Sequence, residues 1–155
     1  MIVDKKSSPG YAMILTTEVA CYTKDIMDRD LHPVSAKIAI YTPDRTKVLL
    51  TEYVPGKYGL PGGHLDAGEA PEEALIRELH EELSISLTPA KITRRDFWRH
   101  NNSKIVLGFT AILPENTPVI LDPAEVYAIR WTPIDDIRSG AVTAGDYDQF
   151  ILGAA

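Results

Sequence analysis

Residues 60–85 read LPGGHLDAGEAPEEALIRELHEELSI, a Pro-Gly-Gly turn that leads into an acidic, helix-like run. Pro71 suits the first position of a helix, because its missing N–H has no partner to lose there, and the glutamates that follow it suit the positive end of the helix dipole. We therefore expect a helix that begins near Ala70. Between positions 66 and 82 the only basic residue is Arg77, beside seven acidic ones: Asp66, Glu69, Glu72, Glu73, Glu78, Glu81 and Glu82.

The expected helix has an apolar side and an acidic side. At about 100° per residue, its apolar positions form one stripe and three glutamates share the neighbouring sector. The stripe consists of Leu75, Ile76, Leu79 and Leu83, and the sector of Glu78, Glu81 and Glu82. Carboxylates three or four residues apart repel one another, by about 0.2–0.5 kcal/mol per exposed pair, and a bound cation reverses that sign. Hard ions such as Mg²⁺ take oxygen ligands. Spacing alone leaves two interpretations, half of a metal site or, more commonly, a solvated acidic face.

The glycine turn before the helix makes the pattern specific. From Gly63 the chain reads Gly, five residues, Glu69, seven residues and then RELHEELSI. This resembles the Nudix box of the Nudix hydrolases, G-x5-E-x7-R-E-U-x-E-E-x-G-U, in which U is an apolar residue. One fixed position departs, because Ser84 stands where the pattern has Gly. That departure concerns the turn after the helix and removes no carboxylate.

The resemblance implies a metal-dependent hydrolase. In the family, the carboxylates that match Glu78, Glu81 and Glu82 hold Mg²⁺ or Mn²⁺, and the backbone carbonyl of the residue that matches Gly63 lies near the metal. The residues that match Glu69 and Arg77 brace the loop against the helix. The reaction is the attack of water on phosphorus within a diphosphate, where metal ions neutralise phosphate oxygens and lower the pKa of bound water.

One carboxylate must also accept a proton. The resemblance implies either the position that matches Glu78 or a carboxylate from outside the box. Glu125, six residues before Trp131 at the end of a late strand, resembles the place from which many Nudix hydrolases supply that extra carboxylate. It is a candidate ahead of Glu115. The catalytic candidates are therefore Glu78, Glu82 and Glu125.

Strands and short helices are expected on both sides of the box. The turn at residues 42–45 has a physical cause, because Pro43 fixes its own φ and Asp44 can bond the backbone that follows. The expected strands are residues 36–41, 47–54, 91–99, 105–113 and 126–131, and the expected later helices are residues 133–137 and 147–152. With the resemblance, this order predicts an α/β fold, the Nudix α/β/α sandwich with a mixed β-sheet between helices.

Basic residues gather near the second strand pair. Five of the sixteen basic residues in the chain are Lys91, Arg94, Arg95, Arg99 and Lys104. They either meet the substrate phosphates or base, with Trp98 available for stacking, or form an ordinary solvated strand face, which is favoured for any single residue. Alternation along a strand places Arg94 and Trp98 on one face, and Arg95, Phe97 and Arg99 on the other. The substrate-binding candidates are Tyr58, Arg94 and Trp98.

Length and composition set wider bounds. At 155 residues, with 45% apolar and 25% charged residues, the chain is expected to form one globular domain. Measured against the shortest members of the Nudix family, residues 1–34 resemble an N-terminal extension, which either covers the substrate or makes homodimer contacts. The net charge of −6 argues against binding to nucleic-acid backbones. The single cysteine, Cys21, excludes an internal disulfide and favours a reducing, cytoplasmic location. No apolar run is long enough to predict a signal peptide or a membrane span.

Together these observations predict a metal-dependent pyrophosphohydrolase that uses Mg²⁺ or Mn²⁺. Its small-molecule partner is expected to be a nucleoside diphosphate derivative, in particular a nucleoside triphosphate or related nucleotide. Residues 99–103 lack the proline and the tyrosine that mark the family's ADP-ribose and diadenosine polyphosphate classes, and the NADH class is likewise disfavoured. Cys21 stands in no context that matches an isopentenyl diphosphate isomerase. The alternative is a non-catalytic Nudix domain that binds a nucleotide and regulates a partner.

Overall fold

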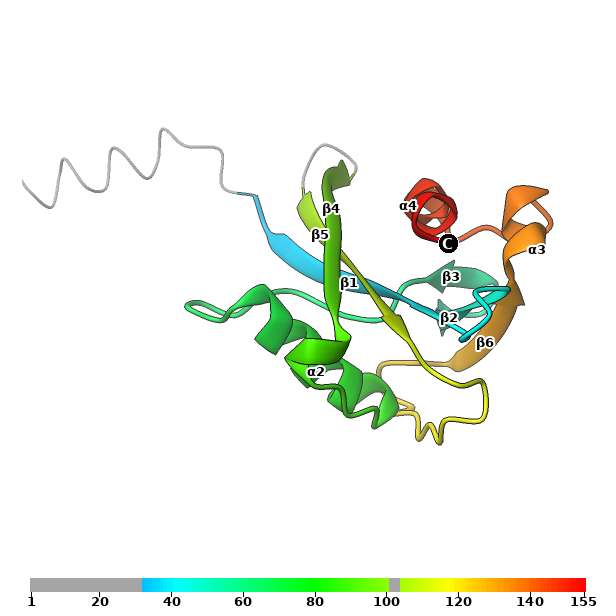
Figure 1. The fold of residues 1–155 in the computed structure, drawn as a ribbon. Coiled ribbons are helices and arrows are strands. Elements are labelled where there is room, and N and C mark those ends of the chain that lie inside the picture. The colour runs from blue at the N-terminus through cyan, green and yellow to red at the C-terminus, as the bar shows by residue number, and fades with distance from the viewer. Residues whose placement is uncertain (1–31, 101–103) are drawn as a thin grey trace, which may run out of the picture. The chain divides into compact units, whose positions relative to one another are not determined.

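A computed structural model describes residues 32–100 and 104–155 of the chain (Figure 1). Most of the predicted N-terminal extension, with Cys21, lies outside these residues. Within the described part of the chain, no helix combines the length and apolar character needed to cross a membrane.

The centre of the fold is one mixed β-sheet, as predicted. Its strand order is β3-β2-β1-β5-β4, with β6 paired to β2. Only β1 and β5 pair in parallel, and the other pairs are antiparallel. The strands are β1 Val34–Tyr41, β2 Lys47–Val54, β3 Lys57–Gly59, β4 Thr93–His100, β5 Lys104–Ile112 and β6 Ala128–Pro133. The predicted strands are confirmed to within about two residues, and the three-residue β3 is an addition.

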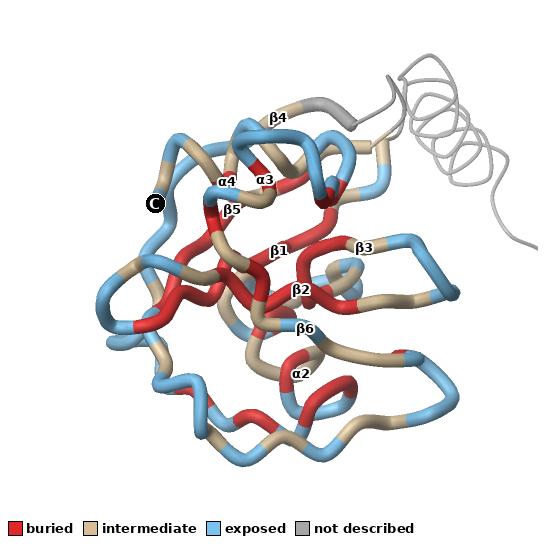
Figure 2. Tube along the Cα trace, turned by 90° about the vertical axis from the view of Figure 1, so that its right-hand side faces the viewer, coloured by how far each residue is buried: buried red, intermediate tan, exposed pale blue. Residues whose placement is uncertain are grey.

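Helices cover both faces of the sheet, which confirms the predicted sandwich (Figure 1). Along β1 the side chains alternate, so that Ile38 and Ile40 pack toward one core and Ala39 and Tyr41 toward the other. Figure 2 shows this buried material running through β1, β2 and β5. Helix α2 Pro71–Leu83 lies on the first face, and α3 Ile134–Arg138 and α4 Asp148–Ala154 lie on the second.

Helix α2 begins and ends as its sequence dictates. Ala70 is the residue before the helix and Pro71 its first residue, while the Glu73 carboxylate accepts a hydrogen bond from the Ala70 N–H at 3.1 Å. At the other end Ser84 has φ 54°, a left-handed conformation that favours glycine. The Ile85 N–H then donates to the Leu79 carbonyl at 3.1 Å. The turn expected of the box therefore forms without its glycine.

The glycine loop, residues 60–65 with Gly62 and Gly63, lies beside the first half of β1, where a neighbouring strand would otherwise pair. Strands β1 and β2 pair only at Ile40 with Leu49 and at Tyr41 with Val48. Toward its beginning, β1 instead bonds the loop, because the N–H groups of Ala36 and Ile38 donate to the carbonyls of Gly63 and Pro61 at 2.9 and 3.1 Å. The loop is thus fixed by the sheet itself, which positions everything attached to it.

A β-bulge in β4 overturns one prediction. The register with β5 shifts between Arg94 and Asp96, so one extra residue is inserted and every later side chain changes face. Arg94 lies over the ring of Phe109 on the α2 face, with 5.5 Å from Cζ to the ring centroid. Trp98 instead stacks on Phe150 of α4. The prediction that Arg94 and Trp98 share one face is therefore wrong.

Candidate active site

Two glycines let the loop approach both the sheet and helix α2. Gly62 has φ +112°, and a Cβ there would lie 2.3 Å from the carbonyl oxygen of Ala36. A Cβ on Gly63 would lie 2.2 Å from a carboxylate oxygen of Glu78. At Gly62 the obstacle is backbone and φ is positive, so that position needs glycine, whereas a Cβ at Gly63 would require the Glu78 carboxylate to move. The box carboxylate and the loop backbone are consequently in direct contact.

Three carboxylates converge beside this loop. Glu78, Glu82 and Glu125 each offer an oxygen, and these oxygens lie within 4.8 Å of one another. Two come from successive turns of α2, and the third comes from the segment that precedes β6. Oxygen donors this close are the set that a hard divalent ion takes, and without a cation they repel one another. The structure thus brings Glu125, the candidate from outside the box, beside two of the box carboxylates.

Glu81 is not one of the three carboxylates in this group, although it contacts the same Arg77 nitrogen as Glu78. It is exposed, and one of its oxygens lies 3.1 Å from Nη1 of Arg77. The carbonyl of Gly63 accepts the Ala36 N–H and so faces β1. Neither the Glu81 carboxylate nor the Gly63 carbonyl belongs to the group of three converging carboxylates. Their roles in metal binding remain predictions. Glu115 lies elsewhere, in an ion pair of 2.8 Å with Lys47.

Arg77 joins the loop to the helix. Its guanidinium contacts both oxygens of Glu69 at 2.9 and 3.0 Å, and it donates to the His64 carbonyl at 3.1 Å. It also donates to Glu78 at 2.9 Å. The hydrogen bonds from Arg77 hold the pKa of the Glu69 carboxyl below its usual range. Two-pronged contacts of this kind fix the orientation of the loop relative to the helix.

Glu82 is the buried member of the carboxylate group. It is 4% exposed, and its Oε2 accepts a hydrogen bond from the Gly62 N–H at 3.0 Å. Burial raises the pKa of its carboxyl, while nearby Lys37 and the Gly62 N–H oppose that rise. A carboxylate with one fixed donor keeps its remaining lone pairs in a defined direction. Glu82 is therefore oriented by the backbone of the loop.

Lys37 is a site residue that the sequence reasoning missed. It lies on β1 and is 9% exposed, and its Nζ donates to the Gly62 carbonyl and to the Tyr53 hydroxyl, the latter at 3.3 Å. Burial lowers the pKa of Lys37 to about 8, against the attraction of Glu82. The available signal was one lysine inside the otherwise apolar run of VSAKIAIY. Charged side chains are rarely buried without a partner, so that position invited a functional explanation.

Trp98 borders a cavity on the α4 face. The cavity has a volume of about 570 Å³, and Asp96, Gln149 and Phe150 also line it. The indole ring stacks on Phe150, with centroids 5.0 Å apart, and its Nε1 is buried and has no hydrogen-bond partner among the described residues. Gly108 leaves room for both rings, because a Cβ there would lie 2.7 Å from each.

The other two substrate candidates lie in different surroundings. Tyr58 is half-buried on β3 and packs against the core on the α4 face. Arg94 forms an ion pair with Glu72 of α2 at 2.9 Å, on the opposite face of the sheet from Trp98. The predicted basic cluster is thus divided between two faces, and only part of it borders the Trp98 side.

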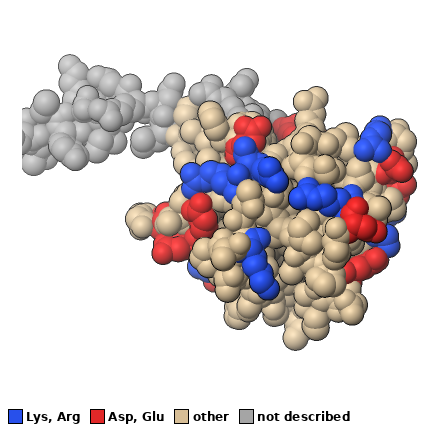
Figure 3. Space-filling model, viewed as in Figure 1, with Lys and Arg blue, Asp and Glu red and all other residues tan. Residues whose placement is uncertain are grey.

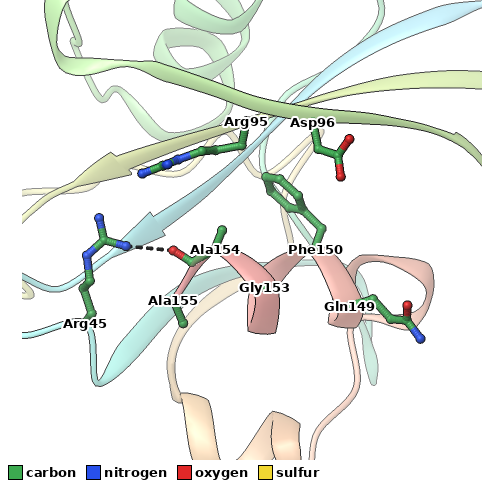
Figure 4. Close-up of a pocket in the computed structure, with 8 residues that line it drawn as sticks. All are labelled: Arg45, Arg95, Asp96, Gln149, Phe150, Gly153, Ala154 and Ala155. Atoms are coloured by element: carbon green, nitrogen blue, oxygen red, sulfur yellow. Dashed lines mark hydrogen bonds between the residues drawn. The ribbon is translucent and has the colours of Figure 1, made fainter.

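Two arginines line a second cavity on the α4 face, of about 480 Å³ (Figure 4). Arg95 extends from β4 toward Arg45, whose Nη1 donates to the Ala154 carbonyl at 2.7 Å. Basic side chains gather across the face of the molecule seen in Figure 3. Arg45 was not among the predicted basic residues, because it is distant from β4 in sequence and reaches it only through the β1–β2 turn.

Comparison with known proteins identifies a family and several relatives. The model of the NUDIX domain family matches residues 31–151. The chain is 25% identical over 123 residues to the NAD-capped RNA hydrolase NudC of Pseudomonas putida (strain W619), which covers 77% of this chain and 44% of that protein. It is 28% identical over 113 residues to an isopentenyl-diphosphate Delta-isomerase of Cereibacter sphaeroides, which covers 64% of each.

A solved structure with the same fold is the NUDIX domain of Shewanella oneidensis NrtR complexed with ADP ribose. Its TM-score is 0.64 at 22% identity, over 89% of this chain and 94% of that one. The chain spans less than half the length of the NudC relative and about two thirds of the isomerase.

Proposed function

We propose, on the premise that this chain belongs to the NUDIX domain family, that it is a hydrolase that cleaves a phosphorus anhydride in a nucleoside diphosphate derivative. The observation that carries the proposal is the convergence of Glu78, Glu82 and Glu125 beside the glycine loop. One box helix could present two carboxylates for structural reasons. A third from a distant segment, directed at the same point, is what a cation site requires.

Mg²⁺ or Mn²⁺ fits this donor set. Three carboxylates with oxygens within 4.8 Å can share one or more hard divalent ions, and Gly63 leaves space beside Glu78 that a side chain would fill. Glu78 and Glu82 would hold the ion, with Glu125 beside them and Glu81 as a further candidate. When bound, the ion supplies the positive charge that phosphoryl transfer needs near the phosphate oxygens.

Other functions, the orientation of the ligands and the acceptance of a proton, are assigned to residues of the chain. The N–H of Gly62 orients Glu82, and Arg77 holds the loop and the helix at a fixed separation. We assign proton acceptance from the attacking water to Glu125, because its carboxylate is exposed and receives no hydrogen bond within the described part of the chain. Glu78 and Glu82 each already accept a hydrogen bond, from Arg77 and from Gly62.

The nucleoside part of the substrate is assigned to the Trp98 cavity. Trp98 pairs with Val106, Val106 pairs with Ser35, and Ser35 bridges to His64 beside the glycine loop. Three pairing steps, about 14 Å at roughly 4.8 Å each, therefore separate Trp98 from the loop. A ligand whose diphosphate lies at the carboxylates reaches Trp98 around the end of the sheet, because α2 lies on one face and the Trp98 cavity on the other. The stacked rings of Trp98 and Phe150 give this cavity an aromatic wall against which a base can pack.

The substrate class extends beyond nucleoside triphosphates. A relative named as an NAD-capped RNA hydrolase and a fold neighbour complexed with ADP ribose add dinucleotides and ADP-ribose to the compounds that merit testing. We propose a small-molecule nucleotide as the partner. A reducing compartment such as the cytoplasm suits a chain with one cysteine.

The decisive experiment is hydrolysis of a nucleotide panel with Mg²⁺ or Mn²⁺. The panel contains nucleoside triphosphates, NAD⁺, NADH and ADP-ribose, with isopentenyl diphosphate isomerisation assayed in parallel. We expect metal-dependent release of a nucleoside monophosphate, pyrophosphate or phosphate from at least one nucleotide, and no isomerisation. Tight nucleotide binding without turnover of any compound would instead indicate the regulatory alternative.

A further inference from the structure

Lys37 places a positive charge where the carboxylate group meets the glycine loop. Its Nζ donates to the carbonyl of Gly62, and the N–H of the same glycine donates to Glu82. One loop residue therefore contacts the lysine through its carbonyl and the glutamate through its amide. The lysine reaches this point from β1, a strand fixed on both sides by the sheet and the loop.

The contacts of Lys37 do not by themselves explain a buried ammonium. Both hydrogen-bond partners, the Gly62 carbonyl and the Tyr53 hydroxyl, are neutral, and the residue is only 9% exposed. Burying an ammonium is costly unless a negative charge compensates it. The negative charges that act on Lys37 are those of Glu82 and, more weakly, Glu78. These are two of the three residues proposed to hold the metal.

We propose that the Lys37 ammonium acts as a tethered cation of the metal centre, which neutralises part of the Glu82 and Glu78 charge and weakens the binding of a divalent ion. The inference rests on the proposed metal site but not on any particular substrate. In the metal-free protein the lysine stabilises the buried carboxylate. With a divalent ion bound, the same positive charge repels it. Lys37 is therefore a positioning residue that tunes metal affinity.

A purely structural role for Lys37 makes the opposite prediction. If the lysine only braced the Gly62 carbonyl, its removal would loosen the loop and weaken metal binding. If it acts as a tethered cation, its removal deletes a like charge beside the ion and strengthens metal binding. The direction of the change in Mn²⁺ affinity separates the two roles.

The test compares the wild-type protein with Lys37→Met, which keeps the length of the side chain and removes the charge, and with Lys37→Arg, which keeps the charge. Lys57→Met, an exposed lysine on β3, is the matched control. Mn²⁺ affinity is measured by electron paramagnetic resonance of the free ion, and melting temperatures are measured with EDTA and with Mn²⁺. We expect Lys37→Met to bind Mn²⁺ about tenfold more tightly, to melt several degrees lower in EDTA, and to gain more from Mn²⁺ than the wild type.

The controls should behave like the wild type. Lys37→Arg and Lys57→Met are expected to keep its Mn²⁺ affinity. An unchanged or weaker Mn²⁺ affinity in a folded Lys37→Met protein overturns the inference while leaving the proposed hydrolase intact. If the wild type itself binds no Mn²⁺, both proposals fail. If the wild type binds Mn²⁺ but hydrolyses no nucleotide, and Lys37→Met binds it more tightly, the tethered cation stands without the proposed hydrolase.

Discussion

The glycine loop with α2 and the cavity beside Trp98 lie at the same end of the sheet but are built from different interactions. Ion pairs and charged hydrogen bonds stabilise the first region: Arg77 contacts both Glu69 and Glu78, and the loop backbone orients the buried Glu82. Apolar packing stabilises the second region, where Trp98 and Phe150 stack on each other in the space left by the missing side chain of Gly108. Charges placed at fixed distances suit a reacting phosphate, and a shaped aromatic cavity suits the group that identifies the substrate.

The charged region is therefore expected to set the rate of the reaction, and the aromatic region the affinity for the substrate. Damage to the charged region should lower kcat, and damage to the aromatic region should raise KM. Variants in the two regions can be matched in size so that the contrast does not depend on stability alone.

The largest effect is expected for Glu82→Gln. The change keeps the shape of the side chain and the acceptor for the Gly62 N–H, but it removes the negative charge from the centre of the carboxylate group. We expect a loss of kcat on the order of 10³-fold, with a cooperative thermal transition retained. Glu73→Gln, an exposed position on the same helix, should keep wild-type turnover. Undiminished turnover by Glu82→Gln would sink the assignment of the metal centre.

A smaller loss is expected for Glu125→Gln. This carboxylate comes from the segment before β6 and is exposed, so water can replace part of its function. We expect kcat to fall by about 10²-fold, as measured by steady-state kinetics. Glu115→Gln, which breaks only the ion pair with Lys47, is the control. Wild-type kinetics for Glu125→Gln would reduce Glu125 to a surface residue.

Two glycine variants contrast the regions directly. In Gly63→Ala the new methyl group would meet the Glu78 carboxylate at 2.2 Å, and in Gly108→Ala it would meet the rings of Trp98 and Phe150 at 2.7 Å. We expect Gly63→Ala to lower kcat and Gly108→Ala to raise KM by about tenfold, with destabilisation of about 1–3 kcal/mol from overpacking in each. Steady-state kinetics and urea unfolding measure both quantities. The division into two regions fails if both variants change the same kinetic constant.

The sequence predicted the charged region far better than the aromatic one, and the reason is physical. The box helix, its start at Pro71 and its buried stripe at Leu75, Leu79 and Leu83 are local features, set by periodicity and helix-end chemistry within one segment. Glu125 was found only through the resemblance, because no local pattern brings it to α2. Its placement depends on how the segment before β6 returns to the sheet.

The aromatic region depends on details that residue patterns do not encode. A single inserted residue at the β4 bulge moves Trp98 to the α4 face, and simple alternation cannot anticipate that. Phe150 and Gly108 meet Trp98 only after three distant segments pack together. Lys37 was overlooked for a different reason, since a charge inside an apolar strand is visible in sequence but has no partner until the loop at Gly62 lies against β1.

The smallest predicted effect lies at the end of α2, where stability can change while both regions stay as they are. Ser84 adopts φ 54°, which costs a residue with a Cβ roughly 1 kcal/mol relative to glycine, and its side chain is exposed. Ser84→Gly should therefore raise the free energy of unfolding by about 0.5–1 kcal/mol, as the relief of backbone strain outweighs the added flexibility of the unfolded chain. Urea unfolding measures the gain, and kcat and KM should keep their wild-type values. Ser86→Gly, at a nearby exposed serine outside the helix, is the control and should not stabilise the protein. Lower stability for Ser84→Gly would show that the strain at this turn is compensated by contacts of the serine itself.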